Sequence, residues 1–89
     1  MNIIKVLKST TDDWHPNIKG SDGKEYITVS FYTTKNPKGH YLVCVWGLDD
    51  CGMELWLPEY EQALKVFLEV CKLPSLTFKN LSSLGLTTA

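Results

Sequence analysis

Few side chains in this chain have the chemistry that catalysis or metal binding needs, and their spacing suits neither. The 89 residues include two histidines, His15 and His40, and neither lies beside a serine or cysteine in a recognisable nucleophile motif. The acidic and thiol side chains of residues 49–51 have no partners at a spacing that closes a metal site. The sequence therefore favours a protein that is not an enzyme and predicts no catalytic residue, metal or cofactor.

Aromatic, hydroxyl and lysine side chains form a second chemically useful set, between residues 24 and 56. Tyrosine, tryptophan, threonine and serine are interleaved along predicted strands, and Lys35 and Lys38 lie in a predicted turn. Single-stranded nucleic acid is bound by aromatic rings that stack on bases and by lysines that follow phosphates. The chain has no arginine, so any such contact would lack bidentate guanidinium readout.

The elements that would position these residues are predicted between residues 25 and 73. Residues 25–34, 40–48 and 53–57 read as strands, with turn signals at 35–39 and 49–52, and residues 3–8 predict a first strand. Pro58 opens a helix and Pro74 ends it. We expect an α+β fold: a four-stranded antiparallel meander followed by one long helix.

The 89 residues are expected to form a single domain. Its sheet and helix would occupy residues 1–74, and residues 75–89 would form an extension. In that extension, residues 76–79 suggest a short strand, residues 80–85 suggest a helical turn capped by Asn80, and residues 87–89 are expected to fray.

The hairpin loops decide which residues share a face of the sheet, because strand side chains alternate between faces. A four-residue first loop pairs Lys35 with His40, whereas a five-residue loop turns the next strand over. Pairing Leu48 with Met53 in the second hairpin favours the four-residue loop. The helix would then face Ile27, Val29, Phe31, Leu42, Cys44, Trp46, Leu48, Met53, Leu55 and Leu57. The outer face would carry Tyr26, Thr28, Ser30, Tyr32, Tyr41, Val43, Val45, Glu54 and Trp56.

The predicted helix has more apolar surface than one sheet needs. One face of the helix carries Tyr60, Ala63, Leu64, Phe67 and Cys71. A second stripe consists of Val66, Val70 and Leu73. This spare stripe predicts a partner surface, such as a twofold-related copy.

Composition narrows the setting of the protein. The net charge is −1, which neither demands nor excludes nucleic acid, and no apolar run is long enough to span a bilayer. Three cysteines without a CxxC pair suit reduced thiols, and the first residues lack the apolar core of a signal peptide. The expected compartment is the cytoplasm.

Several residue patterns follow one another in a suggestive order. They are Lys24-Glu25-Tyr26-x-x-Val29-Ser30-Phe31, then Tyr41 with Trp46 five residues later, then Gly52-Met53-x-Leu55 leading to Glu59-Tyr60 and Leu64. Over about residues 24–68, this order resembles the positive cofactor four family, whose members are single-stranded DNA-binding transcriptional coactivators.

The resemblance implies a homodimer joined through its helices, with single-stranded DNA running over the sheets. The residues expected to bind DNA are Lys24, Tyr32, Lys35, Lys38, Tyr41, Trp46 and Trp56. Because the chosen register turns Trp46 toward the helix, Trp56 is expected to serve in its place. The process would be replication, recombination or transcription. The alternative is a small protein-binding inhibitor or adaptor that uses the same aromatic face.

Overall fold

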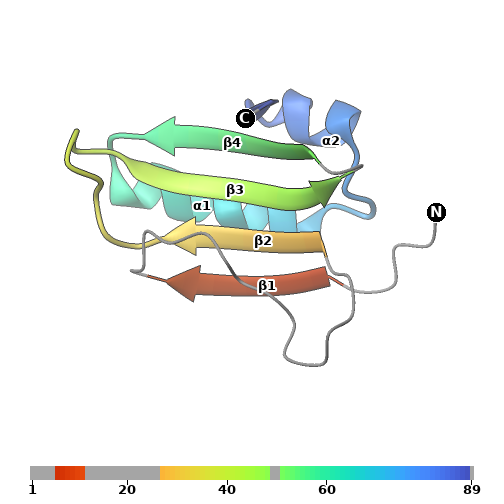
Figure 1. Ribbon diagram of the computed structural model, residues 1–89, viewed down its shortest axis with the longest axis horizontal. Helices are drawn as coiled ribbons and strands as arrows, with labels where there is room; N and C mark the ends of the chain where they lie inside the picture. The colour runs from red at the N-terminus through yellow and green to blue at the C-terminus, as the bar shows by residue number, and fades with distance from the viewer. Residues whose placement is uncertain (1–5, 12–26, 49–50, 89) are drawn as a thin grey trace.

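A computed structural model describes residues 6–11, 27–48 and 51–88 of the chain (Figure 1). Its elements are β1 (Val6–Thr11), β2 (Ile27–Tyr32), β3 (Tyr41–Leu48), β4 (Cys51–Leu57), α1 (Tyr60–Lys72), α2 (Phe78–Ser83) and β5 (Thr87–Thr88). Within these residues the strands form one sheet in the order β1-β2-β3-β4-β5. The long helix α1 lies across one face of this sheet.

The α+β prediction is confirmed, because antiparallel strands lead directly into a helix. The pairs β2–β3, β3–β4 and β4–β5 are antiparallel, but β1 pairs with β2 in parallel. The first strand therefore departs from the expected antiparallel meander. It is described over Val6–Thr11, and residues 3–5 of the predicted strand lie outside the described part of the chain. A parallel pair needs a connection of a dozen or more residues. Residues 12–26, which separate β1 from β2, are long enough for that return.

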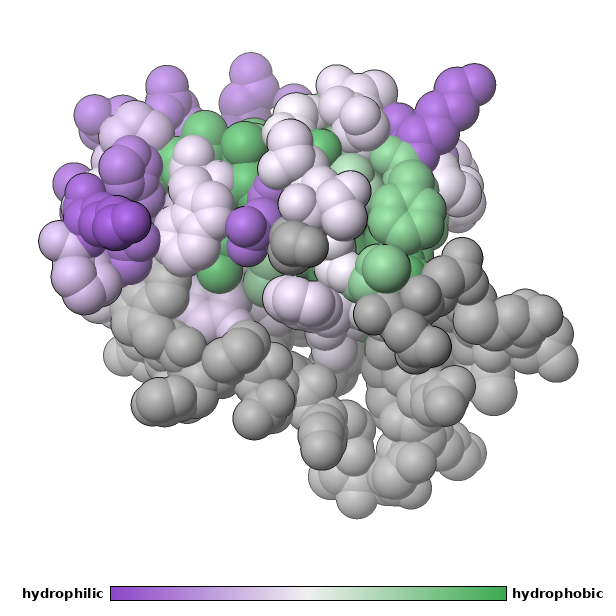
Figure 2. Space-filling model, turned by 45° about the horizontal axis from the view of Figure 1, so that its top comes forward, coloured by the Kyte–Doolittle hydropathy of each residue, from purple (hydrophilic) through white to green (hydrophobic). Residues whose placement is uncertain are grey.

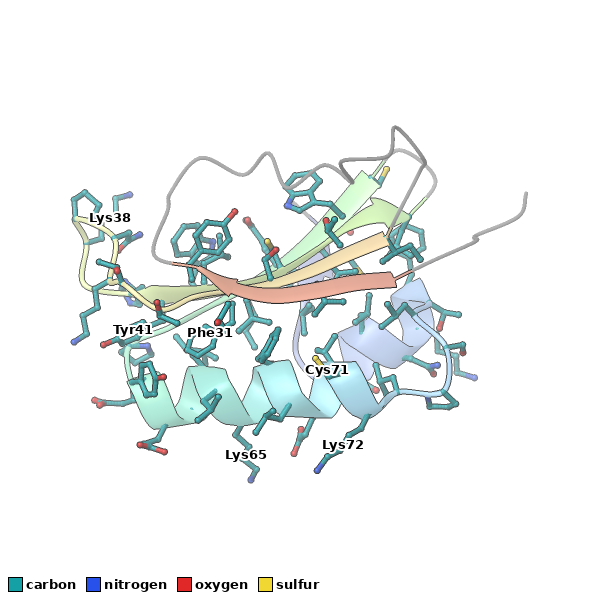
Figure 3. All side chains as sticks on the ribbon, turned by 90° about the horizontal axis from the view of Figure 1, so that it is seen from below. Phe31, Lys38, Tyr41, Lys65, Cys71 and Lys72 are labelled. Carbon is teal, nitrogen blue, oxygen red and sulfur yellow. The ribbon has the colours of Figure 1, made fainter. Side chains whose placement is uncertain are left out.

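The core lies between the sheet and α1. Val29, Phe31, Val43 and Val45 are fully buried on the sheet side, and Ala63, Phe67 and Val70 are buried on the helix side. Figure 3 shows Phe31 pointing from the sheet toward α1, and its ring centroid is 5.8 Å from that of Phe67. Each buried valine or phenylalanine side chain contributes about 1.5–3 kcal/mol by leaving water.

The first hairpin has the register of the five-residue loop, so the prediction of a four-residue loop was wrong. Tyr32 lies opposite Leu42 and Thr28 lies opposite Trp46. The Oδ1 of Asn36 accepts hydrogen bonds from the backbone N–H groups of Lys38 and His40, at 3.0 and 2.9 Å. Gly39 closes the loop with φ +84°, a conformation that favours glycine. As a result β3 is turned over: Tyr41, Val43 and Val45 face α1, while Leu42, Cys44 and Trp46 lie on the outer face.

The predicted pairing of the second hairpin was also wrong, because β3 contains a β-bulge. The register shifts between Trp46 and Leu48, and Gly47 between them has φ +97°. Leu48 consequently lies opposite Cys51 and not opposite Met53 as predicted. Leu48 and Met53 both still reach the core beneath the sheet. The extra residue breaks the alternation from which the face of Trp46 was inferred.

Helix α1 ends just before Pro74, as predicted, but its second apolar stripe is not spare. Val70 is only 1% exposed in a single chain, and Val66 and Leu73 pack against the same core. The inference that this stripe is a partner surface was therefore wrong for Val70. The large hydrophobic side chains that α1 presents to solvent are instead Leu68, which is 46% exposed, and Tyr60 in the first turn, which is 41% exposed.

The chain after Pro74 is more ordered than predicted. Residues 78 and 79 belong to α2 rather than a strand, and Thr77, not Asn80, caps it by accepting a hydrogen bond from the N–H of Asn80. The helix ends in a Schellman motif, because Leu86 N–H donates to Leu81 O and Gly85 N–H donates to Ser82 O. This turn leads into β5, which pairs with β4 where fraying was expected.

Candidate nucleic-acid interface

The outer face of the sheet, opposite α1, carries three of the residues that sequence reasoning favoured for binding: Tyr32, Trp46 and Trp56. The strand register sets three rows of neighbouring side chains across this face. The rows are Thr28–Trp46–Gly52, Ser30–Cys44–Glu54–Thr87 and Tyr32–Leu42–Trp56. Trp46 and Trp56 therefore share a face, and the predicted conflict over Trp46 disappears.

The part of this face over β2 and β3 is buried. Tyr32 is 2% exposed and forms a buried cluster with Leu42 and Cys44, and Thr28 and Ser30 are buried too. Tyr32 was predicted to contact DNA, but its ring is not open to an incoming base. Accessible surface on the described part of the outer face is therefore concentrated along β4.

We name the accessible part the β4 band: Trp46, Glu54 and Trp56. Trp46 belongs to β3, but its ring lies directly over Gly52 of β4, where an added Cβ would collide with it. Three successive outward positions of β4 thus present an indole, a carboxylate and a second indole. Positions 52 and 56 are separated by roughly 13 Å at the usual rise of a strand. Trp46 and Trp56 are 38% and 40% exposed, and Glu54 is half-buried.

The thiol of Cys44 lies next to the β4 band and takes no part in its chemistry. Burial raises the pKa of Cys44 to about 11, partly offset by hydrogen bonds with the side chains of Trp46 and Tyr32, while Glu54 adds to the rise. The thiol is neutral at ordinary pH and is a poor nucleophile.

The two lysines of the β2–β3 hairpin lie in different surroundings. The Nζ of Lys35 is 5.5 Å from the ring centroid of Tyr41, a cation–π distance. Tyr41 faces α1, where its ring packs edge-on against Tyr60 at 5.5 Å. In Figure 3, Tyr41 lies on the α1 side, whereas Lys38 lies at the hairpin tip away from α1. Of the two, only Lys38 is placed to extend the β4 band, at the end where Trp56 lies.

The structure brings together part of the predicted site. Trp46 and Trp56 come together along β4 with Lys38 beyond Trp56, whereas Tyr32 is buried and Tyr41 holds Lys35 on the other face. Lys24 lies outside the described residues. Sequence reasoning missed Gly52 and Glu54 as parts of the site. The pairing of Gly52 with Trp46 would have indicated that the indole lies over β4, but this pairing is apparent only in the correct register.

The position of the hydrophilic side chains agrees with the placement of Lys38 at the hairpin tip. Figure 2 shows hydrophilic side chains gathered at the end of the molecule that carries the β2–β3 hairpin. Among the described residues, no three histidine, cysteine or acidic side chains cluster closely enough to hold a metal ion. None of the described helices combines the length and apolar character that crossing a membrane requires.

Comparison with protein-family models, with curated proteins and with solved structures finds no match. The residues and geometry of the chain therefore carry the argument about function.

Proposed function

We propose that this protein binds single-stranded DNA through the β4 band, without enzymatic activity. The observation that carries the proposal is the exposure of Trp46 and Trp56 on one face of the sheet. Indole rings held on a rigid sheet are platforms for unpaired bases, and each stacked base contributes roughly 1–3 kcal/mol. Lys38, beyond the Trp56 end of the band, would contact a phosphate of the same strand.

Stacking is expected to dominate this binding over charge. The net charge is −1 and the chain contains no arginine, so few phosphates can be neutralised. Binding should therefore weaken only moderately with salt. Bases inside a duplex are already stacked on one another, so a paired strand offers the indoles little.

The test is a titration of a labelled oligo-dT, followed by fluorescence anisotropy. Replacing either band tryptophan, as Trp46→Ala or Trp56→Ala, should weaken binding roughly fivefold to a hundredfold, the range of one lost stacking contact. Phe78→Ala is the matched control, because Phe78 is 39% exposed but lies on α2. Equal effects of all three substitutions would overturn the proposal.

A protein partner is the second candidate function, and Glu54 is the observation that favours it. Tryptophan is a frequent anchor at protein interfaces. A carboxylate between two indoles would also suit a lysine or arginine side chain of a partner, which could combine an ion pair with cation–π contacts. A basic peptide that competes with oligo-dT, or that binds where oligo-dT does not, would identify this function.

The homodimer and the cellular process remain proposals that rest on the resemblance to the positive cofactor four family. A homodimer joined through α1 would now use exposed Leu68 rather than buried Val70. Sedimentation at micromolar concentration tests this, with Leu68→Lys expected to give monomers and the exposed Gln62→Lys to leave the dimer intact. A wild-type monomer would remove the dimer from the proposal. Replication, recombination or transcription are the processes that such a DNA-binding protein would serve.

A further inference from the structure

Glu54 is the one group in the β4 band whose charge opposes the proposed ligand. Its carboxylate lies on the outer face between the rings of Trp46 and Trp56, and it is half-buried. Within the described part of the chain, this carboxylate makes no hydrogen bond or ion pair. A negative side chain in that position repels phosphates, so a strand on the band must place a base there and keep its phosphates away.

The Watson–Crick edges of unpaired bases differ in what they offer a carboxylate. Guanine presents two adjacent donors, N1–H and N2–H, whose spacing matches the two carboxylate oxygens in the way that a guanidinium does. Cytosine and adenine present one amino group next to a ring-nitrogen acceptor. Thymine presents a single N–H between two carbonyl oxygens, both of which repel the carboxylate.

We infer that Glu54 reads the base that lies between the two indoles and selects guanine there. This inference rests on the proposed function and adds a base preference to it. Trp46 and Trp56 would stack on flanking bases, which fixes the strand along β4. The edge of the central base would then turn toward Glu54, where guanine forms two charge-assisted hydrogen bonds and thymine forms at most one.

The experiment compares labelled oligo-dT strands that carry one substituted central nucleotide, measured by anisotropy. A single guanine should bind more tightly than all-thymine by roughly fivefold to a hundredfold, the range of a good bidentate pair. A central cytosine or adenine should fall between them. Deoxyinosine keeps N1–H but lacks the N2 amino group, so it should lose most of the gain from guanine.

The variant Glu54→Gln has the same shape and removes the charge. It should abolish the preference for guanine and, because the phosphates are no longer repelled, bind all-thymine strands at least as tightly as the wild type does. Urea unfolding of this variant checks that the fold is intact. Equal wild-type binding of all the strands would overturn the inference and leave the proposed function standing. Failure to bind any strand, with binding of a basic peptide instead, would overturn both.

Discussion

Gly52 is the residue that allows the β4 band to exist. Trp46 lies opposite Gly52 in the β3–β4 ladder, and the indole occupies the space that any side chain at position 52 would need. A glycine within a strand usually weakens it, and it often marks a close approach of another group. Here that group is the indole ring of Trp46, which extends from β3 and lies over the backbone of β4.

Replacing this glycine should act through the tryptophan. The added methyl group of Gly52→Ala must push the Trp46 ring off β4, because the ring atoms lie within contact distance of the new Cβ. We expect oligo-dT affinity to fall as far as in Trp46→Ala. In the double variant the two losses should not add, since both remove the same platform. Additive losses, measured by anisotropy, would contradict this account of Gly52.

Because of Cys44, the free energy of unfolding should fall as the pH becomes alkaline. Its folded-state pKa of about 11 is higher than the ordinary thiol pKa of 9.0, so the folded protein holds the thiol proton more tightly than the unfolded chain does. The stabilisation is fully present below pH 9 and is lost as the pH rises through about 11. Its full size is on the order of 2–3 kcal/mol. Urea unfolding at several pH values should show a decline that Cys44→Ala makes shallower; equal slopes in the two proteins would refute the assignment.

At the scale of elements, the sequence predicted correctly which side chains face the core wherever one face of an element is clearly apolar. Strands β2 and β4 alternate cleanly, so Val29, Phe31 and Met53 were placed correctly against the helix. The end of α1 followed from Pro74, whereas its start was predicted two residues early, because α1 begins at Tyr60 with Glu59 as its N-cap and Pro58 lies outside the helix. These elements fix the layer arrangement of the molecule.

Strand β3 could not be oriented from the sequence, because its two faces are nearly equally apolar. Val43 and Val45 alternate with Leu42 and Cys44, so burial favours neither face. The bulge at Gly47 then interrupts the alternation of side chains between the two faces, so Leu48 and Trp46 lie on opposite faces although they are two residues apart. Counting back from a correctly buried Leu48 therefore placed Trp46 on the wrong face. The accessible site was recognisable only after this reversal.

The β2–β3 hairpin should contribute to binding through one of its two lysines. Lys38 is exposed at the tip, whereas the ammonium of Lys35 is held over the ring of Tyr41 on the α1 side. We expect Lys38→Ala to reduce oligo-dT affinity and to lower the slope of log affinity against log salt by about 0.7, the value for one phosphate contact on a single strand. Lys35→Ala is the matched control and should leave the slope nearly unchanged. A larger change for Lys35→Ala would reverse the assignment.

The turn between α2 and β5 should be sensitive to a single methyl group. Gly85 has φ +97°, and an added Cβ would meet Leu55 only at an ordinary 3.6 Å, so the cost of Gly85→Ala comes from the backbone. That cost is about 1–2 kcal/mol for an L-residue in the left-handed region. Urea unfolding should show a loss of this size, while Ser82→Ala, on the exposed side of α2, should change stability by only a few tenths of a kcal/mol. Equal losses would contradict the role of the Schellman turn.

At the scale of the whole molecule, the two faces of one sheet differ in how they are buried. The face toward α1 contains the main core, and every strongly apolar position of β2 and β4 on that side contributes to it. On the opposite face, β2 and β3 carry a second, smaller buried cluster, and the accessible surface lies along β4. The folded chain thus offers a narrow strip of two exposed indoles with the carboxylate of Glu54 between them, and its width suits one extended ligand better than a broad partner surface.

The most direct test of the central claim is a comparison of single-stranded and duplex DNA of the same sequence in one anisotropy titration at low salt. We expect the single strand to bind and the duplex to bind at least tenfold more weakly, because only unpaired bases can stack on Trp46 and Trp56. The same preference should be absent in the double variant Trp46→Ala, Trp56→Ala. No binding of the single strand at low salt, or equal binding of both forms, would contradict the proposal that the β4 band is a single-stranded DNA interface.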